Sequence, residues 1–143
     1  MAMQIKTKDL DQINKLLSQN EDDKVFNLAS KLITKYPGHP LFFNIKGFIL
    51  FKKERHAEAI PFFKEAIKRE PLFLDAYNNL ALSSYALRDI NSAVENFQKV
   101  IEIDPKNYSA NVHLGQIYYT SNYYGDAKPY IEKLVETYAD GLL

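Results

Sequence analysis

Residues 74–107 read LDAYNNLALSSYALRDINSAVENFQKVIEIDPKN, and this stretch decides the fold. Its apolar residues recur at the three- and four-residue spacing of amphipathic helices, as in Ala93, Val94, Phe97, Val100 and Ile101. Its 34 residues suit two helices of about 12–14 residues joined by short turns. Because such a helical hairpin cannot bury its apolar face alone, we expect it to stack on similar neighbours.

The same 34-residue step recurs along the rest of the chain. Pro37, Pro71 and Pro105 keep this step, and each ends a unit because proline cannot continue the preceding helix. Five further series share the register: Gly47, Ala81, Gly115; Ala59, Ala93, Ala127; Phe63, Phe97, Ile131; Ile33, Ile67, Ile101, Val135; and Leu32, Ala66, Val100, Leu134. The small residues let helix backbones approach closely, and the large ones fill the remaining space.

These residues resemble the tetratricopeptide repeat (TPR) family, whose pattern combines aromatic, Leu-Gly, Tyr, Ala and Pro positions. The matching residues are Phe43, Gly47, Leu50, Ala59, Phe63, Ala66 and Pro71 in one repeat, Tyr77, Leu80, Ala81, Ala93, Phe97 and Pro105 in the next, and Leu114, Gly115, Tyr118 and Ala127 in the last. An upstream unit matches loosely through Ile13, Leu16, Val25, Ala29, Leu32 and Pro37. The resemblance implies an all-α fold, a right-handed superhelical α–α solenoid of about eight antiparallel helices.

The resemblance also implies a single TPR domain over residues 1–143, with repeats at about 6–39, 40–73, 74–107 and 108–141, the first one degenerate. We expect helices at about 7–19, 22–36, 40–53, 56–69, 74–87, 90–103, 108–121 and 124–139. Three kinds of position depart from the family pattern. Lys46 replaces a leucine, Asn111 replaces an aromatic residue, and Glu54, Arg88 and Asn122 replace the usual glycine. We expect the stem of Lys46 to pack while its ammonium group reaches solvent.

In this family the first helix of each repeat lines a concave groove, and the resemblance places a partner there. The candidate groove residues are Asn44, Phe48, Phe51, Asn78, Asn79, Leu82, Tyr85, His113, Gln116 and Tyr119, with Lys52 and Asp75 as candidate charges. Amides can hydrogen-bond a peptide backbone, and aromatic rings supply contact area. We therefore predict a site for an extended or helical segment with apolar side chains. The alternative is that Phe48, Phe51 and Tyr85 only pack between repeats.

Chaperone adaptors that resemble this fold clamp a C-terminal carboxylate with lysine, arginine and asparagine residues of the groove. Counted from the second repeat, the corresponding residues here are Asn44, Phe48, Asn79, Ser109 and His113, and only Asn79 agrees. Counted from the first repeat, Leu10 and Ile45 do not match and Asp75 would repel a carboxylate. We therefore expect the chain not to bind a chaperone tail in this way.

The last predicted helix carries an apolar set too broad for one neighbouring helix. Its candidate self-association residues are Tyr130, Leu134 and Tyr138. An exposed apolar patch is often an interface. Three interpretations remain open: a two-fold homodimer through this helix, the repeat domain of a longer protein, or a face that the tyrosine hydroxyls keep sufficiently polar.

Composition excludes several classes of function. The 18 Lys+Arg balance the 18 Asp+Glu, and this neutral balance offers no basic surface for nucleic acid. There is no cysteine, no apolar run long enough to span a membrane, and no apolar leader at the N-terminus. No metalloprotease, nucleophile-elbow, dinucleotide or Walker motif occurs. We therefore expect no catalysis, cofactor, metal or nucleic-acid partner, no membrane insertion, and a cytoplasmic location.

The prediction that combines these observations is a non-catalytic protein–protein interaction module that binds a protein or peptide segment in the concave groove. Alternatives are an N-terminal substrate-positioning or assembly domain of a larger enzyme, of the glycosyltransferase or sulfotransferase type, and a self-associating scaffold. Because the predicted groove is mostly amide and aromatic, we expect partner binding to depend only weakly on salt.

Overall fold

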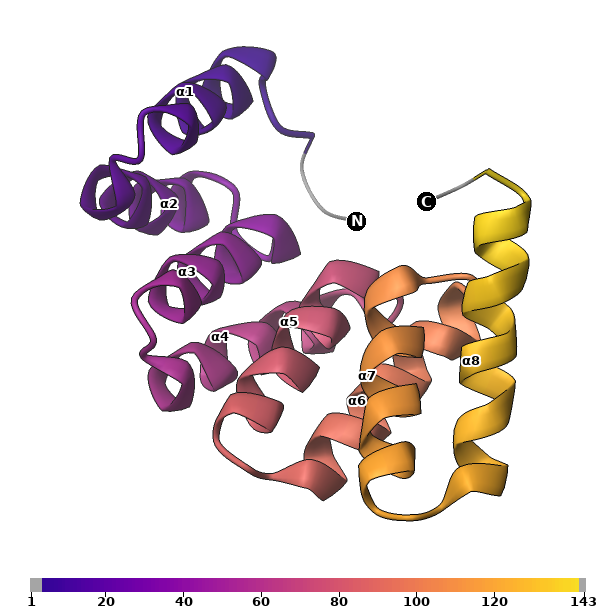
Figure 1. The fold of residues 1–143 in the computed structure, drawn as a ribbon. Helices are drawn as coiled ribbons and strands as arrows, with labels where there is room; N and C mark the ends of the chain where they lie inside the picture. The colour runs from indigo at the N-terminus through magenta and orange to yellow at the C-terminus, as the bar shows by residue number, and fades with distance from the viewer. Residues whose placement is uncertain (1–3, 142–143) are drawn as a thin grey trace.

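The computed structural model describes residues 4–141, which form a curved stack of helical hairpins (Figure 1). The eight helices within this range are α1 Thr7–Ser18, α2 Asp22–Lys35, α3 Pro40–Lys52, α4 His56–Arg69, α5 Leu74–Ala86, α6 Ile90–Ile103, α7 Tyr108–Thr120 and α8 Tyr124–Ala139. The part of the chain that the structure describes contains no strand. The predicted all-α solenoid of eight helices is confirmed.

The helices begin where the sequence predicts, and five of them end one residue earlier than predicted. The four turns inside the hairpins explain most of this difference. Each turn places a residue in the left-handed region, namely Asn20 (φ 55°), Glu54 (φ 58°), Arg88 (φ 65°) and Asn122 (φ 64°). The next amide then bonds back five residues, as from Arg55 N to Leu50 O at 2.9 Å and from Asp89 N to Ser84 O at 2.9 Å. This Schellman geometry closes each first helix without glycine.

The core is distributed along the solenoid in three clusters between neighbouring helices. The first joins α1, α2 and α3 around Val25, Ala29 and Phe42, the second joins α3, α4 and α5 around Ala59 and Phe63, and the third joins α5, α6 and α7. The alternation of small and large residues is a physical requirement at one position. A Cβ atom on Gly47 would lie 2.6 Å from the Phe63 ring, so this crossing of α3 and α4 admits no side chain.

Asn111, which stands where the family has an aromatic residue, performs a specific structural task. In the preceding repeat the Tyr77 hydroxyl donates to the carbonyl of Pro71 at 3.1 Å. The Asn111 amide donates to the carbonyl of Pro105 at 3.0 Å, which is the same bond one repeat later. Asn111 is only 2% exposed, so the bond satisfies a buried amide. The departure from the pattern therefore preserves the contact with the signature proline.

Candidate partner-binding groove

A hollow of about 270 Å³ lies between α3 and α5, the first helices of two successive repeats. These helices are in contact although α4 separates them in the sequence. The hollow is lined by Asn44, Ile45, Phe48, Asp75, Asn78 and Asn79. Five of these six are candidates from the sequence, Asn44, Phe48, Asp75, Asn78 and Asn79, and the fold brings them together because they share one face of each helix.

The amides of the hollow are held by a contact between the two repeats. Asn79 Nδ2 donates to Asn44 Oδ1 at 3.2 Å, and Asn44 is only 8% exposed. The neighbouring Asn78 differs, because its Oδ1 atom is buried and accepts no hydrogen bond. A buried polar atom without a partner is uncommon in native structures. The hollow therefore contains one satisfied amide pair and one amide whose oxygen lacks a donor.

The two candidate charges of the groove behave differently. Lys52 donates to Asp22 of α2 at 2.7 Å, so its charge is compensated within the fold. Asp75 is exposed and takes part in no ion pair among residues 4–141. The hollow itself has no Lys, Arg or His among its lining residues. The formal charge of the hollow is therefore negative. The sequence alone did not show that Lys52 would be paired while Asp75 would not.

His113 lies farther along the same face, on α7, and is fixed on three sides. Its Nδ1–H donates to the carbonyl of Ser109 at 2.7 Å, since a carbonyl can only accept. Its ring stacks on Phe97 with centroids 4.9 Å apart and meets the edge of Tyr85 at 5.7 Å. His113 thus joins the groove face to the core.

The remaining groove candidates separate into packed and exposed side chains. Leu82 and Tyr85 pack against the cluster between α5 and α7, and Phe51 packs against the cluster around Phe63. Gln116 is exposed, and Tyr119 is 57% exposed with its ring edge-on to Tyr124 at 5.1 Å. Phe48, at 37% exposed, is the aromatic side chain that reaches the hollow.

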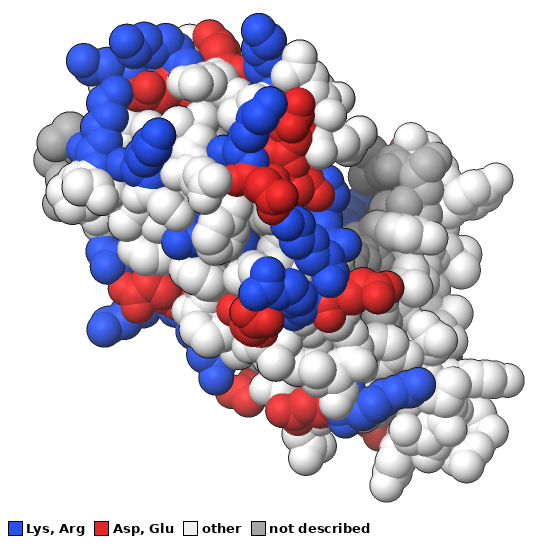
Figure 2. All heavy atoms as spheres, turned by 90° about the vertical axis from the view of Figure 1, so that its left-hand side faces the viewer, with Lys and Arg blue, Asp and Glu red and all other residues white. Residues whose placement is uncertain are grey.

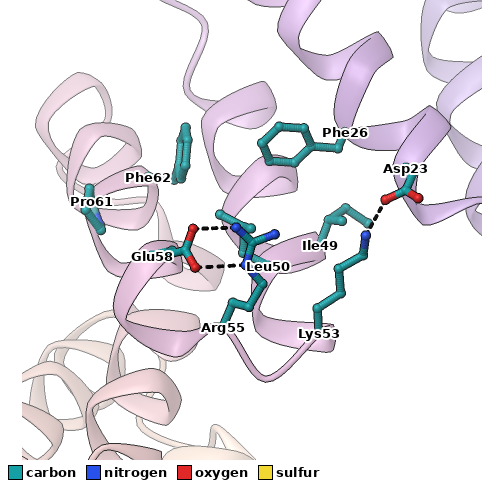
Figure 3. Close-up of a pocket in the computed structure, with 9 residues that line it drawn as sticks. All are labelled: Asp23, Phe26, Ile49, Leu50, Lys53, Arg55, Glu58, Pro61 and Phe62. Carbon is teal, nitrogen blue, oxygen red and sulfur yellow. Dashed lines mark hydrogen bonds and ion pairs between the residues drawn. The ribbon is translucent and has the colours of Figure 1, made fainter.

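A second hollow, of about 440 Å³, was not predicted from the sequence. It lies between α2, α3 and α4, where Phe26 meets Phe62 edge-on at 6.2 Å and two ion pairs, Asp23–Lys53 and Arg55–Glu58, form the rim (Figure 3). Residues two repeats later line a similar hollow of about 400 Å³ between α6 and α7, including Asn91, Val94, Ile117, Tyr118, Ser121 and Tyr123. The residues of the two hollows occupy the same repeat positions, 68 residues apart, as Asp23 and Asn91 or Phe26 and Val94 do.

Lys46 covers the aromatic pair beside this second hollow. Its Nζ atom lies 4.5 Å from the Phe26 ring centroid and 4.8 Å from that of Phe62. The stem of Lys46 is partly buried, and cation–π contacts hold its ammonium group over the two rings. Burial lowers the pKa of Lys46 below its ordinary value.

The charged side chains on the side formed by α1 to α4 are of both signs and interspersed (Figure 2). Ion pairs such as Arg69–Glu65 and Lys24–Glu21 account for part of this pattern. This face therefore presents no continuous basic surface. No helix within residues 4–141 has the length and apolar character needed to cross a membrane.

The outer face of α8 is apolar and exposed. Ile131 is 43%, Val135 65% and Tyr138 73% exposed. Of the other predicted self-association residues, Leu134 is half-buried, and Tyr130 stacks on Tyr118 with centroids 5.8 Å apart. Only Tyr138 of the three self-association candidates is therefore freely exposed, and it lies with Ile131 and Val135, which belong to the same broad apolar set of this helix.

Comparison with known proteins identifies relatives of this arrangement. The chain is 32% identical over 97 residues to Hsp70-Hsp90 organizing protein 1 of Glycine max, covering 68% of this chain and 16% of that protein. It is 30% identical over 94 residues to small glutamine-rich tetratricopeptide repeat-containing protein 2 of Mycosarcoma maydis, covering 66% of this chain and 27% of that protein. The chain thus spans about a sixth to a quarter of the length of these relatives.

Solved structures share the fold at lower identity. MamA superimposes with a TM-score of 0.84 at 20% identity, covering 93% of this chain and 78% of that one. The first TPR of Spaghetti (RPAP3), bound to the HSP90 peptide SRMEEVD, superimposes with a TM-score of 0.74 at 20% identity, covering 78% of this chain and 91% of that one. Family models described as "Tetratricopeptide repeat" match residues 42–71, 74–107 and 108–140. The chain therefore belongs to the tetratricopeptide repeat family.

Proposed function

We propose that the chain is a non-catalytic interaction module, and that it binds a peptide or protein segment along the face formed by α3, α5 and α7. The hollow between α3 and α5 is the observation that carries this proposal. It combines a fixed amide pair with an exposed aromatic ring, which suits recognition of a backbone and a neighbouring side chain. Relatives named as organizing proteins, and a similar domain bound to a peptide, support an interaction role.

A peptide selection tests the groove. A phage-displayed library of random 12-residue peptides would be selected on the wild-type protein and counter-screened on Asn79→Ala/Phe48→Ala. The matched control is Lys31→Ala/Glu65→Ala, two substitutions outside the proposed groove. We expect selected peptides to bind the wild type and the control with equal affinity, and to bind the groove variant with at least tenfold lower affinity. Equal binding to all three proteins would refute the proposed site.

We further propose that acidic chaperone tails are not the ligand, although the relatives carry chaperone names. Asn44, Ser109 and His113 stand at the lysine and arginine positions of the clamp. Phe48 stands at one of its asparagine positions, and Asp75 adds a negative charge. The peptide SRMEEVD, which the RPAP3 domain binds, is a direct probe. Fluorescence polarisation with labelled SRMEEVD should show no saturable binding at micromolar protein. Saturable micromolar binding that His113→Ala or Asn79→Ala abolishes would overturn this expectation.

Self-association through α8 is a second proposal, and the exposure of Ile131, Val135 and Tyr138 is the observation that favours it. A two-fold pairing would bury the same apolar strip on both copies. Size-exclusion chromatography with light scattering should give a dimer for the wild type and a monomer for Val135→Glu/Tyr138→Glu. A wild-type monomer at high micromolar concentration would end this proposal without affecting the groove.

Residues 1–143 are proposed to form one domain located in the cytoplasm. Limited proteolysis should leave the chain intact from the first helix to α8, and cell fractionation should recover it with cytoplasmic markers. The chain could also serve as the substrate-positioning or assembly part of a larger enzyme. In that arrangement the same groove would hold the substrate protein.

A further inference from the structure

We propose that the hollow between α3 and α5 receives an arginine side chain of the bound segment. This inference rests on the proposed function, and it defines the partner more closely: a segment with a basic residue flanked by apolar ones. The reasons are the acceptor groups that the hollow presents, the aromatic ring at its edge, and the absence of any competing cation from its six lining residues.

Acceptors predominate among the polar groups that the fold leaves unused. The Asp75 carboxylate is exposed and receives no hydrogen bond from any residue in the range 4–141. Asn78 Oδ1 is buried without a donor and so is not itself open to a ligand, and Asn44 Oδ1 is already occupied by Asn79. A guanidinium group has five N–H donors, no acceptor and a permanent positive charge. It can therefore pair with the exposed carboxylate of Asp75 through two parallel N–H groups.

The apolar part of the hollow suits the rest of an arginine side chain. Phe48 is 37% exposed at the edge, and a planar guanidinium can stack on such a ring. Ile45 offers apolar surface to the methylene stem. At about 270 Å³ the hollow is smaller than the roughly 300–1,000 Å³ of small-molecule pockets. One side chain of a larger partner is the occupant that fits this size.

The same features act against a carboxylate in this position. Lys52, the cation nearest in sequence to Phe48 on the groove face, is engaged with Asp22. An acidic side chain would face Asp75 with no lining cation to compensate it. The hollow thus selects charge of the opposite sign from the SRMEEVD tail bound by the RPAP3 domain.

NMR titration with blocked amino acids tests the proposal directly. The probes are the N-acetyl, N-methylamide derivatives of arginine, norleucine and glutamate, added to ¹⁵N-labelled protein up to tens of millimolar. We expect the arginine probe to shift the side-chain amides of Asn78 and Asn79 and to saturate. The norleucine probe should bind at least fivefold more weakly, and the glutamate probe should leave these signals unmoved.

Two variants and one control make the result specific. Asp75→Asn should lower the affinity for the arginine probe about tenfold. Asp126→Asn removes an acidic residue from the first turn of α8, as Asp75→Asn does from α5, and should leave binding unchanged. Asn78→Leu removes the orphaned oxygen and should raise the thermal unfolding midpoint, which checks separately that this buried atom lacks a donor.

Equal shifts with all three probes, or full arginine binding by Asp75→Asn, would overturn the inference. The groove could still be real in that case, because the library selection would return peptides that depend on Asn79 but lack basic residues. If the selection also gives no groove-dependent peptide, the proposed function fails instead. The two experiments therefore separate an incorrect ligand chemistry from an incorrect site.

Discussion

The left-handed residue in each hairpin turn is a point where one side chain controls stability. Arg88 has φ 65° and is exposed, so its Cβ atom adds strain without compensating contacts. We predict that Arg88→Gly increases the free energy of unfolding by about 0.5–1 kcal/mol, after the entropy that glycine adds to the unfolded chain. Asn122→Gly should gain less, because asparagine tolerates this conformation. Urea denaturation checks both, and a destabilised Arg88→Gly would contradict the expectation.

Asp9 gives the first repeat a defined pH dependence. Lys35 Nζ donates to its carboxylate at 2.6 Å and the Tyr36 hydroxyl donates at 2.5 Å. These two hydrogen bonds, opposed by burial, lower the pKa of Asp9 below its ordinary value of 3.8. A lowered folded-state pKa means that the stabilisation is complete above about pH 4 and is lost as the pH falls through the folded pKa.

The corresponding test compares the wild type with Asp9→Asn. The wild type should have the higher thermal unfolding midpoint at pH 7, and the difference should persist down to about pH 4 and shrink as the pH is lowered further to 3. Circular dichroism at 222 nm measures both midpoints. A difference that stays constant between pH 7 and pH 3 would show that the carboxylate charge is not the stabilising feature.

Some residues could not be assigned from the sequence because their role depends on their neighbours. Repeat position alone placed Phe51, Tyr85 and Phe48 on the same groove face. The structure separates them by their contacts. Phe51 meets the edge of His56 at 5.0 Å and Tyr85 meets His113, whereas Phe48 is 37% exposed at the hollow. Likewise, the pattern showed that Asn111 is unusual, but its bond to Pro105 became evident only from the folded turn.

At the scale of helices, Gly47 and Gly115 occupy the same repeat position but differ in their surroundings. A Cβ atom on Gly47 would lie 2.6 Å from the Phe63 ring, whereas on Gly115 it would lie 3.5 Å from Ile131. We predict that Gly47→Ala lowers the free energy of unfolding by about 1–3 kcal/mol, because α3 and α4 must move apart. Gly115→Ala should stabilise by about 0.5–1 kcal/mol through helix propensity.

Chemical denaturation of the two variants provides the measurement, and each is the control for the other. Equal effects at both positions would mean that the α3–α4 crossing is not as restrictive as the Phe63 contact indicates. Ala81, the natural residue at the same position in the repeat between them, shows that the position accepts a methyl group where the neighbouring side chains leave room.

Helix positions were largely predictable because they follow from the 34-residue register and from proline. Most of the helices that end one residue earlier than predicted do so because of the hydrogen bonds in the turn that follows. The sequence gives no sign of this turn where Glu54 or Arg88 replaces glycine. The groove hollow was harder to predict, because it forms between α3 and α5, which are not adjacent in the sequence. Of the hollows described above, only the one lined by the groove amides had its residues named from the sequence.

At the scale of the whole molecule, the zero net charge conceals an uneven distribution. Residues 1–71 hold 13 of the 18 basic and 9 of the 18 acidic residues, so this half is formally +4 and the other half −4. The groove hollow itself contains one uncompensated charge, Asp75. We therefore predict that a selected groove peptide loses no more than about fivefold in affinity between 50 and 500 mM salt. A hundredfold loss, measured by polarisation, would indicate recognition by the wider charge distribution.

The two ends of the solenoid differ in the surface that they present. In α3 the residues that pack on the preceding hairpin are Phe42, Ile45 and Ile49. The same repeat positions in α1 hold Lys8, Asp11 and Lys15, all exposed. In α8, by contrast, Ile131 is 43% exposed, although Phe63 and Phe97 at its repeat position are fully buried.

This difference gives the molecule a direction of extension. A copy of residues 74–107 joined directly after Gly141 would continue the register and lay a new first helix over Ile131 and Val135. We predict that such a five-repeat protein melts several degrees higher than the natural chain, as measured by calorimetry. The same copy joined before Thr7 would have to desolvate Lys8 and Lys15 and should bring no such gain. We therefore expect that longer binding surfaces can be built by adding repeats after α8 and not before α1.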